Sequence, residues 1–283
     1  MRYVRLGKSD LNVSRLGLDC HSLGIVERDH GWDPFSYDGQ VFAKRTVRAA
    51  LDAGINVFDT SPDVGIGRAE SLLGKALDGR QKDVFLASRF NVARPNIDIA
   101  SSITGSLRRL RAERIDILYV HGIPNGAGTL ASGLNETQQQ ELLRLRDDGY
   151  VGHLGLLVSD PATALPRVES GLYDILQLQC NVDDGDAADK VLDACYENDI
   201  GVSMVKPLAQ STFKSIVDAL DPAWSGASAV RECCLKYLLS DRRVHLINVG
   251  MRWEHEVLTN TRLVAGLDPA LFDSDRGALQ AVT

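Results

Sequence analysis

The 283-residue sequence predicts an α/β fold, a single (β/α)8 (TIM) barrel domain over residues 1–283. Eight short runs of apolar and β-branched residues alternate with segments of helical periodicity, and no linker or low-complexity stretch interrupts them. Several runs are apolar at successive positions, which is typical of parallel strands covered on both faces. The first run continues as LGLDCH, which is not the glycine-rich dinucleotide fingerprint, so the barrel is favoured over an open doubly wound sheet.

The expected elements can be placed along the whole chain. The eight strands are expected at residues 15–19, 56–59, 84–88, 115–121, 153–158, 175–179, 201–205 and 244–249. Amphipathic helices with one apolar stripe are expected at residues 44–53, 97–110, 137–148 and 187–198. Gly54 and Gly149 follow two of these helices and are typical helix stops. The insert 25–39 and the loop 124–135 are expected to shape a pocket, because βα loops set specificity in barrels.

Composition limits the class of protein. Hydrophobic residues make up 44% and charged residues 24% of the chain, which is ordinary for a globular protein. The net charge of −7 argues against nucleic acid or an anionic membrane as a bulk partner. Five cysteines without a C-x-x-C pair predict reduced thiols, and no apolar stretch is long enough for a signal peptide or membrane span. A cytoplasmic protein with a small-molecule substrate is therefore expected.

Polar residues at the strand ends are the candidate site. Reactive groups of a barrel lie at the carboxyl ends of its strands. That rule selects Asp19, His21, Asp59, Arg89 and His121 from the first four strands, and Gln177, Lys206 and Arg252 from later ones. Any one of them alone could form a structural ion pair at the rim, but five polar groups from four strands point to a site.

Several segments resemble bacterial aldo-keto reductases, in order along nearly the whole chain. They are the hairpin and first strand at 5–18, the second strand at 53–61, the following helix at 70–77, and the later segments 176–181, 204–209 and 249–252 with Asn260. The resemblance implies a barrel with an N-terminal β-hairpin. It also implies NADPH-dependent carbonyl reduction by a tetrad of Asp, Tyr, Lys and His, in which the Lys–Asp pair lowers the pKa of the Tyr proton donor.

The tetrad is only half present in this chain. Asp59 and His121 match the family's Asp and His. The position of the Tyr holds Val64, which has no proton to give, and the position of the Lys holds Arg89. Arginine stays protonated and binds planar anions, so it suits an anionic group better than a phenol relay.

The cofactor contacts implied by the resemblance are also altered. Leu157 and Val158 stand where the family carries Ser-Asn for the nicotinamide carboxamide. Asp19 stands where the family has Gly beside the nicotinamide ribose, and its carboxylate is expected to crowd the cofactor. The cofactor-binding residues that the resemblance retains are Gln177, Lys206, Leu208, Gly250, Arg252 and Asn260.

Three functions fit these observations. The sequence favours an enzyme of dehydratase, lyase or isomerase type that works on a small polar metabolite, anionic ones included, by acid–base chemistry without a cofactor. The alternative is an NADPH-dependent carbonyl or aldehyde oxidoreductase whose proton donor is replaced by Tyr37, His21 or His121. A non-catalytic binding protein is the third reading. No H-x-x-x-H pair supports a metal site, so none is expected.

Overall fold

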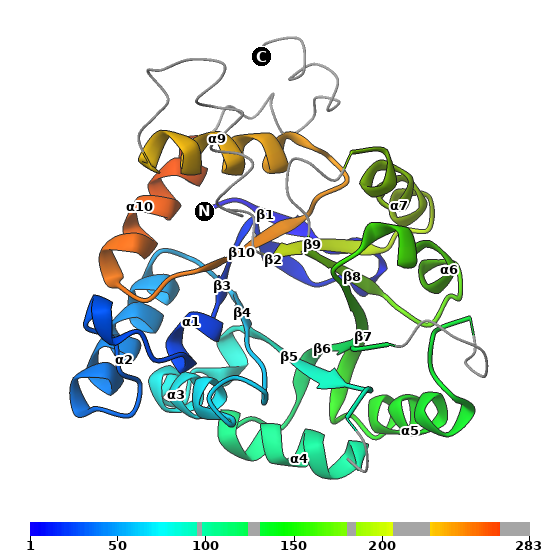
Figure 1. Ribbon diagram of the computed structural model, residues 1–283, viewed down its shortest axis with the longest axis horizontal. Helices are drawn as coiled ribbons and strands as arrows, with labels where there is room; N and C mark the ends of the chain where they lie inside the picture. The colour runs from blue at the N-terminus through cyan, green and yellow to red at the C-terminus, as the bar shows by residue number, and fades with distance from the viewer. Residues whose placement is uncertain (95–97, 124–130, 180–184, 206–226, 267–283) are drawn as a thin grey trace.

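The computed structural model describes residues 1–94, 98–123, 131–179, 185–205 and 227–266, and these form a closed parallel barrel. Figure 1 looks along the barrel, with the helices forming an outer ring around the strands. The strands follow in the order β10-β3-β4-β5-β6-β7-β8-β9, and β10 closes the barrel by pairing with both β3 and β9. The predicted fold class is therefore confirmed.

The eight barrel strands lie where the apolar runs predict them. Their bounds are β3 Leu16–Asp19, β4 Val57–Asp59, β5 Phe85–Asn91, β6 Ile115–His121, β7 Val151–Val158, β8 Ile175–Gln179, β9 Gly201–Val205 and β10 Leu246–Gly250. The main difference is β5, which continues three residues beyond Ser88 because Phe90 and Asn91 still pair with Val120 and His121 of β6.

Helices and short turns connect the strands. The helices are α1 His21–Gly24, α2 Tyr37–Asp52, α3 Arg68–Leu77, α4 Ile99–Leu110, α5 Glu136–Asp147, α6 Leu165–Val168, α7 Gly185–Glu197, α9 Ala227–Ser240 and α10 Glu254–Ala265. The 3-10 turns are η1 Gly7–Ser9, η2 Arg28–His30, η3 Gln81–Asp83 and η4 Pro161–Thr163. No helix among the described residues combines the length and the apolar character that a membrane crossing requires.

The expected boundary of α2 was wrong. The sequence predicts a helix from residue 44, but α2 begins at Tyr37, inside the segment expected to be an insert loop. The hydroxyl of Ser36 accepts the backbone N–H of Gly39 at 2.9 Å and so caps the helix, and Asp38 in the first turn complements the helix dipole.

The hairpin implied by the family resemblance closes one end of the barrel. Strands β1 Tyr3–Arg5 and β2 Asn12–Ser14 pair antiparallel. Leu6 and Val13 are fully buried and pack in one inner cluster with Val57, Ala87, Ile117, Tyr119, Ile175 and Leu246. The amino-terminal end of the barrel interior is therefore filled with apolar side chains, which leaves the opposite end for polar groups.

Candidate active site

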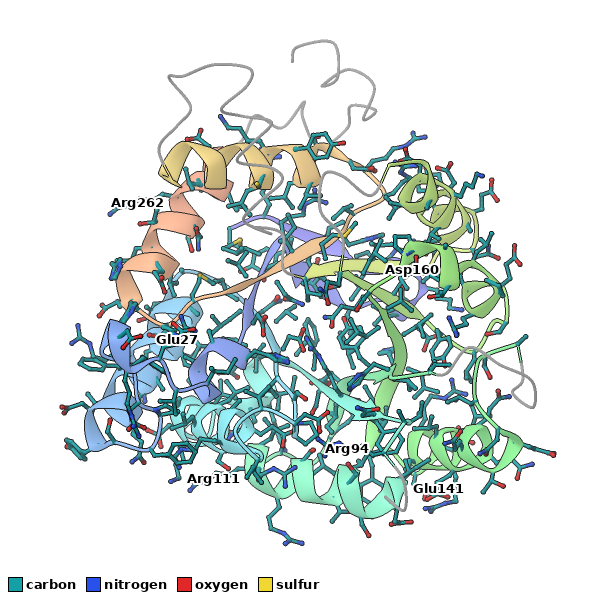
Figure 2. All side chains as sticks on the ribbon, viewed as in Figure 1. Glu27, Arg94, Arg111, Glu141, Asp160 and Arg262 are labelled. Atoms are coloured by element: carbon teal, nitrogen blue, oxygen red, sulfur yellow. The ribbon has the colours of Figure 1, made fainter. Side chains whose placement is uncertain are left out.

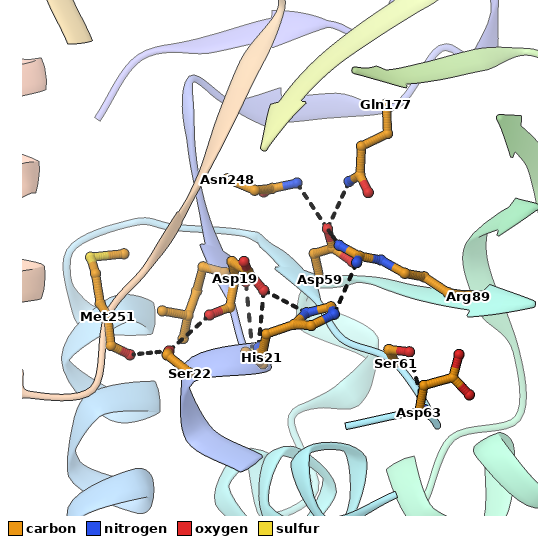
Figure 3. A network of polar contacts seen from close by, with 12 residues as sticks. Asp19, His21, Ser22, Asp59, Ser61, Asp63, Arg89, Gln177, Asn248 and Met251 are labelled. Atoms are coloured by element: carbon orange, nitrogen blue, oxygen red, sulfur yellow. Dashed lines mark hydrogen bonds and ion pairs between the residues drawn. The ribbon is translucent and has the colours of Figure 1, made fainter. Parts of the chain in front are cut away.

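Asp59 lies at the centre of a buried polar network at the carboxyl ends of the strands (Figure 3). Its side chain is fully buried, and its Oδ2 accepts N–H groups from Arg89 Nη2 at 3.0 Å, Gln177 Nε2 at 2.7 Å and Asn248 Nδ2 at 3.4 Å. These donors come from β5, β8 and β10, on three sides of the barrel. A buried carboxylate needs this compensation because it has lost its water.

A glycine in β3 makes room for one of these donors. A Cβ at Gly17 would lie 1.9 Å from Oδ1 of Asn248, so any larger residue would push the amide of Asn248 away. Asn248 also donates to Ser203 Oγ at 3.0 Å. Gly17 therefore belongs to the site through close packing, although it carries no functional group.

Arg89 joins Asp59 to a second acid through a histidine. Its Nη1 lies 2.9 Å from His21 Nε2, and His21 Nδ1 lies 2.7 Å from Asp19 Oδ1 (Figure 3). A guanidinium can only donate, so Nε2 must be the acceptor, and the ring proton on Nδ1 is donated to Asp19. His21 is thus held as the neutral Nδ1–H tautomer, with both ring nitrogens engaged.

Asp19 and Arg89 keep their charges although both side chains are largely buried. Burial raises the pKa of Asp19, but the side-chain and backbone hydrogen bonds from His21 and the charge of Arg89 outweigh it, so the pKa lies below its ordinary value. Burial likewise lowers the pKa of Arg89, but the charges of Asp59 and Asp19 outweigh it and raise that pKa. The site therefore keeps one fixed cation between two carboxylates.

His121 lies at the end of β6 with a different set of neighbours. Its Nε2 is 3.6 Å from Oδ2 of Asp63, and Asp63 is paired with Arg94 at 2.6 Å. Burial and the charge of Arg89 lower the pKa of His121, and Asp63 only partly opposes them. His121 is therefore neutral near pH 7, and its Nε2 has no hydrogen-bond partner among the described residues.

The structure offers no substitute for the proton-donating tyrosine at Val64, which holds the family's tyrosine position, at Tyr119 or at Tyr37. Val64 packs against α1, where a Cβ on Gly24 would lie 2.8 Å from its Cγ1. Tyr119 is a buried member of the inner cluster, and burial together with the charge of Asp59 raises the pKa of its hydroxyl. Tyr37, which the sequence offered as a replacement, is the first residue of α2 and is 79% exposed. The phenol of Tyr119 is therefore not activated by a lowered pKa, and Tyr37 is an exposed helix residue and not a buried phenol at the carboxyl ends of the strands.

The residues implied as cofactor contacts are spread around the same end. Leu157 packs against the inner apolar cluster and Val158 is buried in the outer core, so neither side chain can bind a carboxamide by a hydrogen bond. Gln177 is fully buried and donates to Asp59, while its Oε1 has no hydrogen-bond partner within the described ranges. Lys206 and Leu208 lie outside the described residues.

The segment after β10 contains the remaining contacts. Gly250 ends β10. Arg252 donates from Nε to the carbonyl oxygen of Ser22 at 3.1 Å and from Nη2 to Glu27. Asn260 lies buried on α10, and its Oδ1 has no hydrogen-bond partner in the part of the chain that the structure describes. In Figure 2, Glu27 lies towards α10 and Arg94 lies towards α4.

The strand-end rule found some of these residues and missed others. It selected Asp19, His21, Asp59 and Arg89, which the structure joins in one chain of contacts, and His121, which lies apart from that chain with Asp63. It missed Asp63, Arg94, Glu27 and Asn248. Asn248 lies inside the last strand, and its inward orientation could have been found from the alternation of β10.

Comparisons with known proteins agree with the fold. The model of the "Aldo/keto reductase family" matches residues 23–227. The chain is 29% identical over 302 residues to L-galactose dehydrogenase of Arabidopsis thaliana, covering 95% of this chain and 90% of that protein. It is 28% identical over 167 residues to an uncharacterized oxidoreductase of Bacillus subtilis, covering 55% and 48%. The solved structure of an aldo-keto reductase from Bacillus halodurans superposes with a TM-score of 0.77 at 22% identity, covering 100% and 96%.

Proposed function

Because the chain belongs to the aldo/keto reductase family, we propose that it is an oxidoreductase that interconverts a hydroxyl and a carbonyl group with a nicotinamide dinucleotide. The sequence alone favoured non-redox chemistry. The relatives carry the names dehydrogenase and oxidoreductase, which supports the redox alternative, and no finding supports a lyase or isomerase. The observation that carries the proposal is the free Nε2 of His121 beside the fixed cation of Arg89.

The described residues fit a nicotinamide dinucleotide at two points. Gln177 Oε1 and Asn260 Oδ1 are buried acceptors to which none of the described residues donates a hydrogen bond. A nicotinamide carboxamide and an adenine amino group each offer N–H donors, which such buried oxygens require. Leu157 and Val158 add only apolar contact. The dinucleotide, when bound, exchanges the hydride with the substrate carbon.

Arg89 has an electrostatic role in this proposal. Its guanidinium is held in place by Asp59 and His21, so it needs no reorganisation when negative charge develops on the substrate oxygen. A residue that never loses its proton cannot serve as the acid. The pair of Asp59 and Arg89 therefore orients and stabilises the reacting oxygen.

His121 moves the proton. In the direction of oxidation, the O–H bond of the substrate would break and its proton would pass to Nε2 of His121, while a bound dinucleotide would supply the acceptor for the hydride from the same carbon. His121 is suited to this role because its lowered pKa keeps the imidazole neutral at pH 7. His21 is less suited, because both of its ring nitrogens are already engaged.

The substrate we propose is a small polyhydroxylated compound such as an aldose. The name of the Arabidopsis relative, L-galactose dehydrogenase, supports this class. The polar and charged side chains at the barrel end, including Asp63, Arg94 and His121, suit hydroxyl groups better than an apolar aldehyde.

A cofactor titration followed by a substrate screen tests the proposal. Binding of the oxidised and reduced dinucleotides is followed by the fluorescence of the protein, and oxidation of an aldose panel by the absorbance of the reduced nicotinamide. We expect binding in the micromolar range and oxidation of at least one aldose. Absence of binding at millimolar dinucleotide would overturn the redox proposal.

Acid–base chemistry without a cofactor is the second candidate. Two observations favour it, namely Val64 in place of a proton donor and the apolar side chains of Leu157 and Val158. Elimination or isomerisation of the same sugars in protein freed of nucleotide would support it, measured by NMR of the substrate.

A further inference from the structure

We propose that this chain selects NAD(H) over NADP(H), because two carboxylates occupy the groups that a 2′-phosphate would need. The inference rests on the proposed function, since it concerns the dinucleotide of that reaction. Its residues are Glu27, Glu256 and Arg252, which lie between the loop after β3 and the start of α10. NADP differs from NAD by one phosphate on the adenosine ribose, so selection depends on the charges available to that phosphate.

Arg252 is the cation of the segment that the family resemblance assigns to the nucleotide. Its guanidinium is already engaged, because Nη2 donates to Glu27 and Nε donates to the carbonyl oxygen of Ser22. An arginine that accommodates a 2′-phosphate must present its planar edge to the phosphate oxygens. In this protein the carboxylate of Glu27 already binds the guanidinium edge of Arg252.

Glu27 is held in place by its backbone. Glu27 and Trp32 exchange two backbone hydrogen bonds of 2.8 and 3.0 Å, which close a short loop. Trp32 is fully buried, and its ring packs edge to face on Trp253 with centroids 5.3 Å apart. Trp253 follows Arg252 directly, so the same packing fixes both partners of the ion pair. The carboxylate of Glu27 is therefore preorganised beside Arg252, and moving it away would cost free energy.

The start of α10 is the second place where a phosphate could bind. The first N–H groups of a helix and its dipole attract anions. In this chain Oε2 of Glu256 accepts the backbone N–H of Arg252 at 2.7 Å and of Trp253 at 3.1 Å. The anion at this helix start is therefore the side chain of Glu256, and a phosphate would have to displace it.

The neighbouring cation offers no replacement. Arg45 of α2 reaches the same helix, but it is paired with Glu254 through Nε at 3.1 Å and Nη2 at 2.6 Å. A 2′-phosphate would bring about two negative charges next to Glu27 and Glu256. A 2′-hydroxyl can instead donate a hydrogen bond to a carboxylate, which is how acidic residues select NAD. The charge pattern therefore excludes the phosphate and accepts the hydroxyl.

Binding measurements test this without any turnover. The intact protein is titrated with NAD+, NADP+, AMP and adenosine 2′,5′-bisphosphate, and the fluorescence of Trp253 and Trp32 reports binding. We expect NAD+ to bind at least about tenfold more tightly than NADP+, and AMP more tightly than the bisphosphate. The adenosine fragments separate the selection from any defect at the nicotinamide end.

Variants locate the cause. Glu27→Gln and Glu256→Gln keep a hydrogen-bonding oxygen and remove the charge, so each should tighten NADP+ binding roughly three- to tenfold and change NAD+ binding little. Glu141→Gln is the control, because it removes the same charge from a surface pair on α5, on the other side of the barrel from Glu27 (Figure 2), and it should leave the NAD+ to NADP+ ratio unchanged. Thermal unfolding of each variant checks that it is folded.

The outcomes separate the two proposals. Tighter binding of NADP+ than of NAD+ by the unaltered protein would overturn the inference and leave the oxidoreductase proposal standing. Failure of both dinucleotides to bind would overturn the oxidoreductase proposal and the inference with it. Equal effects of Glu27→Gln and Glu141→Gln on the binding ratio would show that general charge, and not this ion pair, sets the preference.

Discussion

Arg89 is the residue on which the polar network depends, since one guanidinium contacts both Asp59 and His21. Arg89→Met would leave Asp59 buried without its cation, and we expect the free energy of unfolding to fall by about 3–5 kcal/mol. Urea titration measures it. The double variant Asp59→Asn, Arg89→Met removes both charges and should be more stable than the single variant. An Arg89→Met protein as stable as the original would contradict the dependence of Asp59 on this cation.

A second prediction for a single residue is that the protonation of His121 sets the pH dependence of the proposed oxidation. The base form is deprotonated, so kcat/KM should rise with pH, and the midpoint of the rise should lie below the ordinary histidine pKa of 6.5, because the pKa of His121 is lowered. Asp63 raises that pKa, so Asp63→Asn should move the midpoint to still lower pH. His121→Gln should abolish the step in the profile. A midpoint that Asp63→Asn leaves in place would assign the titration to another group.

The site residues that lie at strand ends could be predicted from the sequence. Those that join the site only through tertiary contacts could not. Asp19, Asp59, Arg89 and His121 could be predicted because each lies at or near the carboxyl end of a strand, and strand ends of a barrel converge. Glu27 and Arg94 lie beyond the ends of their strands, and nothing in their local sequence indicates that they face Arg252 and Asp63.

At the scale of elements, the strands were predicted almost to the residue, because a parallel strand buried on both faces is a continuous apolar run. The start of α2 was not predicted, because its polar first turn, Tyr37 to Gln40, shows no apolar stripe. Only the capping residue Ser36 marks the start of this helix. Boundaries that depend on capping are weaker signals than those that depend on burial.

Helix α3 is joined to strand β5 by one buried acid, Glu70. Glu70 is fully buried, accepts Ser88 Oγ at 2.7 Å and binds Arg109 Nε at 2.6 Å, so it joins α3, β5 and α4. We expect Glu70→Ala to lower the free energy of unfolding by about 3 kcal/mol, because Arg109 and Ser88 lose their partner. Glu141→Ala removes a surface pair with Arg144 and should cost less than about 1 kcal/mol. Equal costs in thermal or urea unfolding would show that burial does not distinguish the two pairs.

At the scale of the whole molecule, stability and chemistry are placed at opposite ends of one barrel. The hairpin end is filled by Leu6, Val13 and their apolar neighbours, and the other end carries the charged network of Asp19, Asp59 and Arg89. Close packing at the hairpin end is strict: a Cβ on Gly7, whose φ is +53°, would lie 2.2 Å from the backbone nitrogen of Gly201. This division is common in barrels, where the carboxyl ends of the strands hold the reactive groups.

The separation of the two ends predicts that a cavity at the hairpin end will weaken the fold and leave dinucleotide binding intact. Leu6 is fully buried, so Leu6→Ala should lower the free energy of unfolding by about 2–5 kcal/mol through lost apolar contact and the cavity it leaves. The dissociation constant for NAD+ should stay within about twofold, because no part of the charged network contacts Leu6. Leu258→Ala on α10, where the side chain is 43% exposed, is the surface control and should change stability by less than about 1 kcal/mol. Weaker NAD+ binding by a folded Leu6→Ala protein would mean that packing strain passes through the barrel from one end to the other, and the two ends would then have to be treated as one unit.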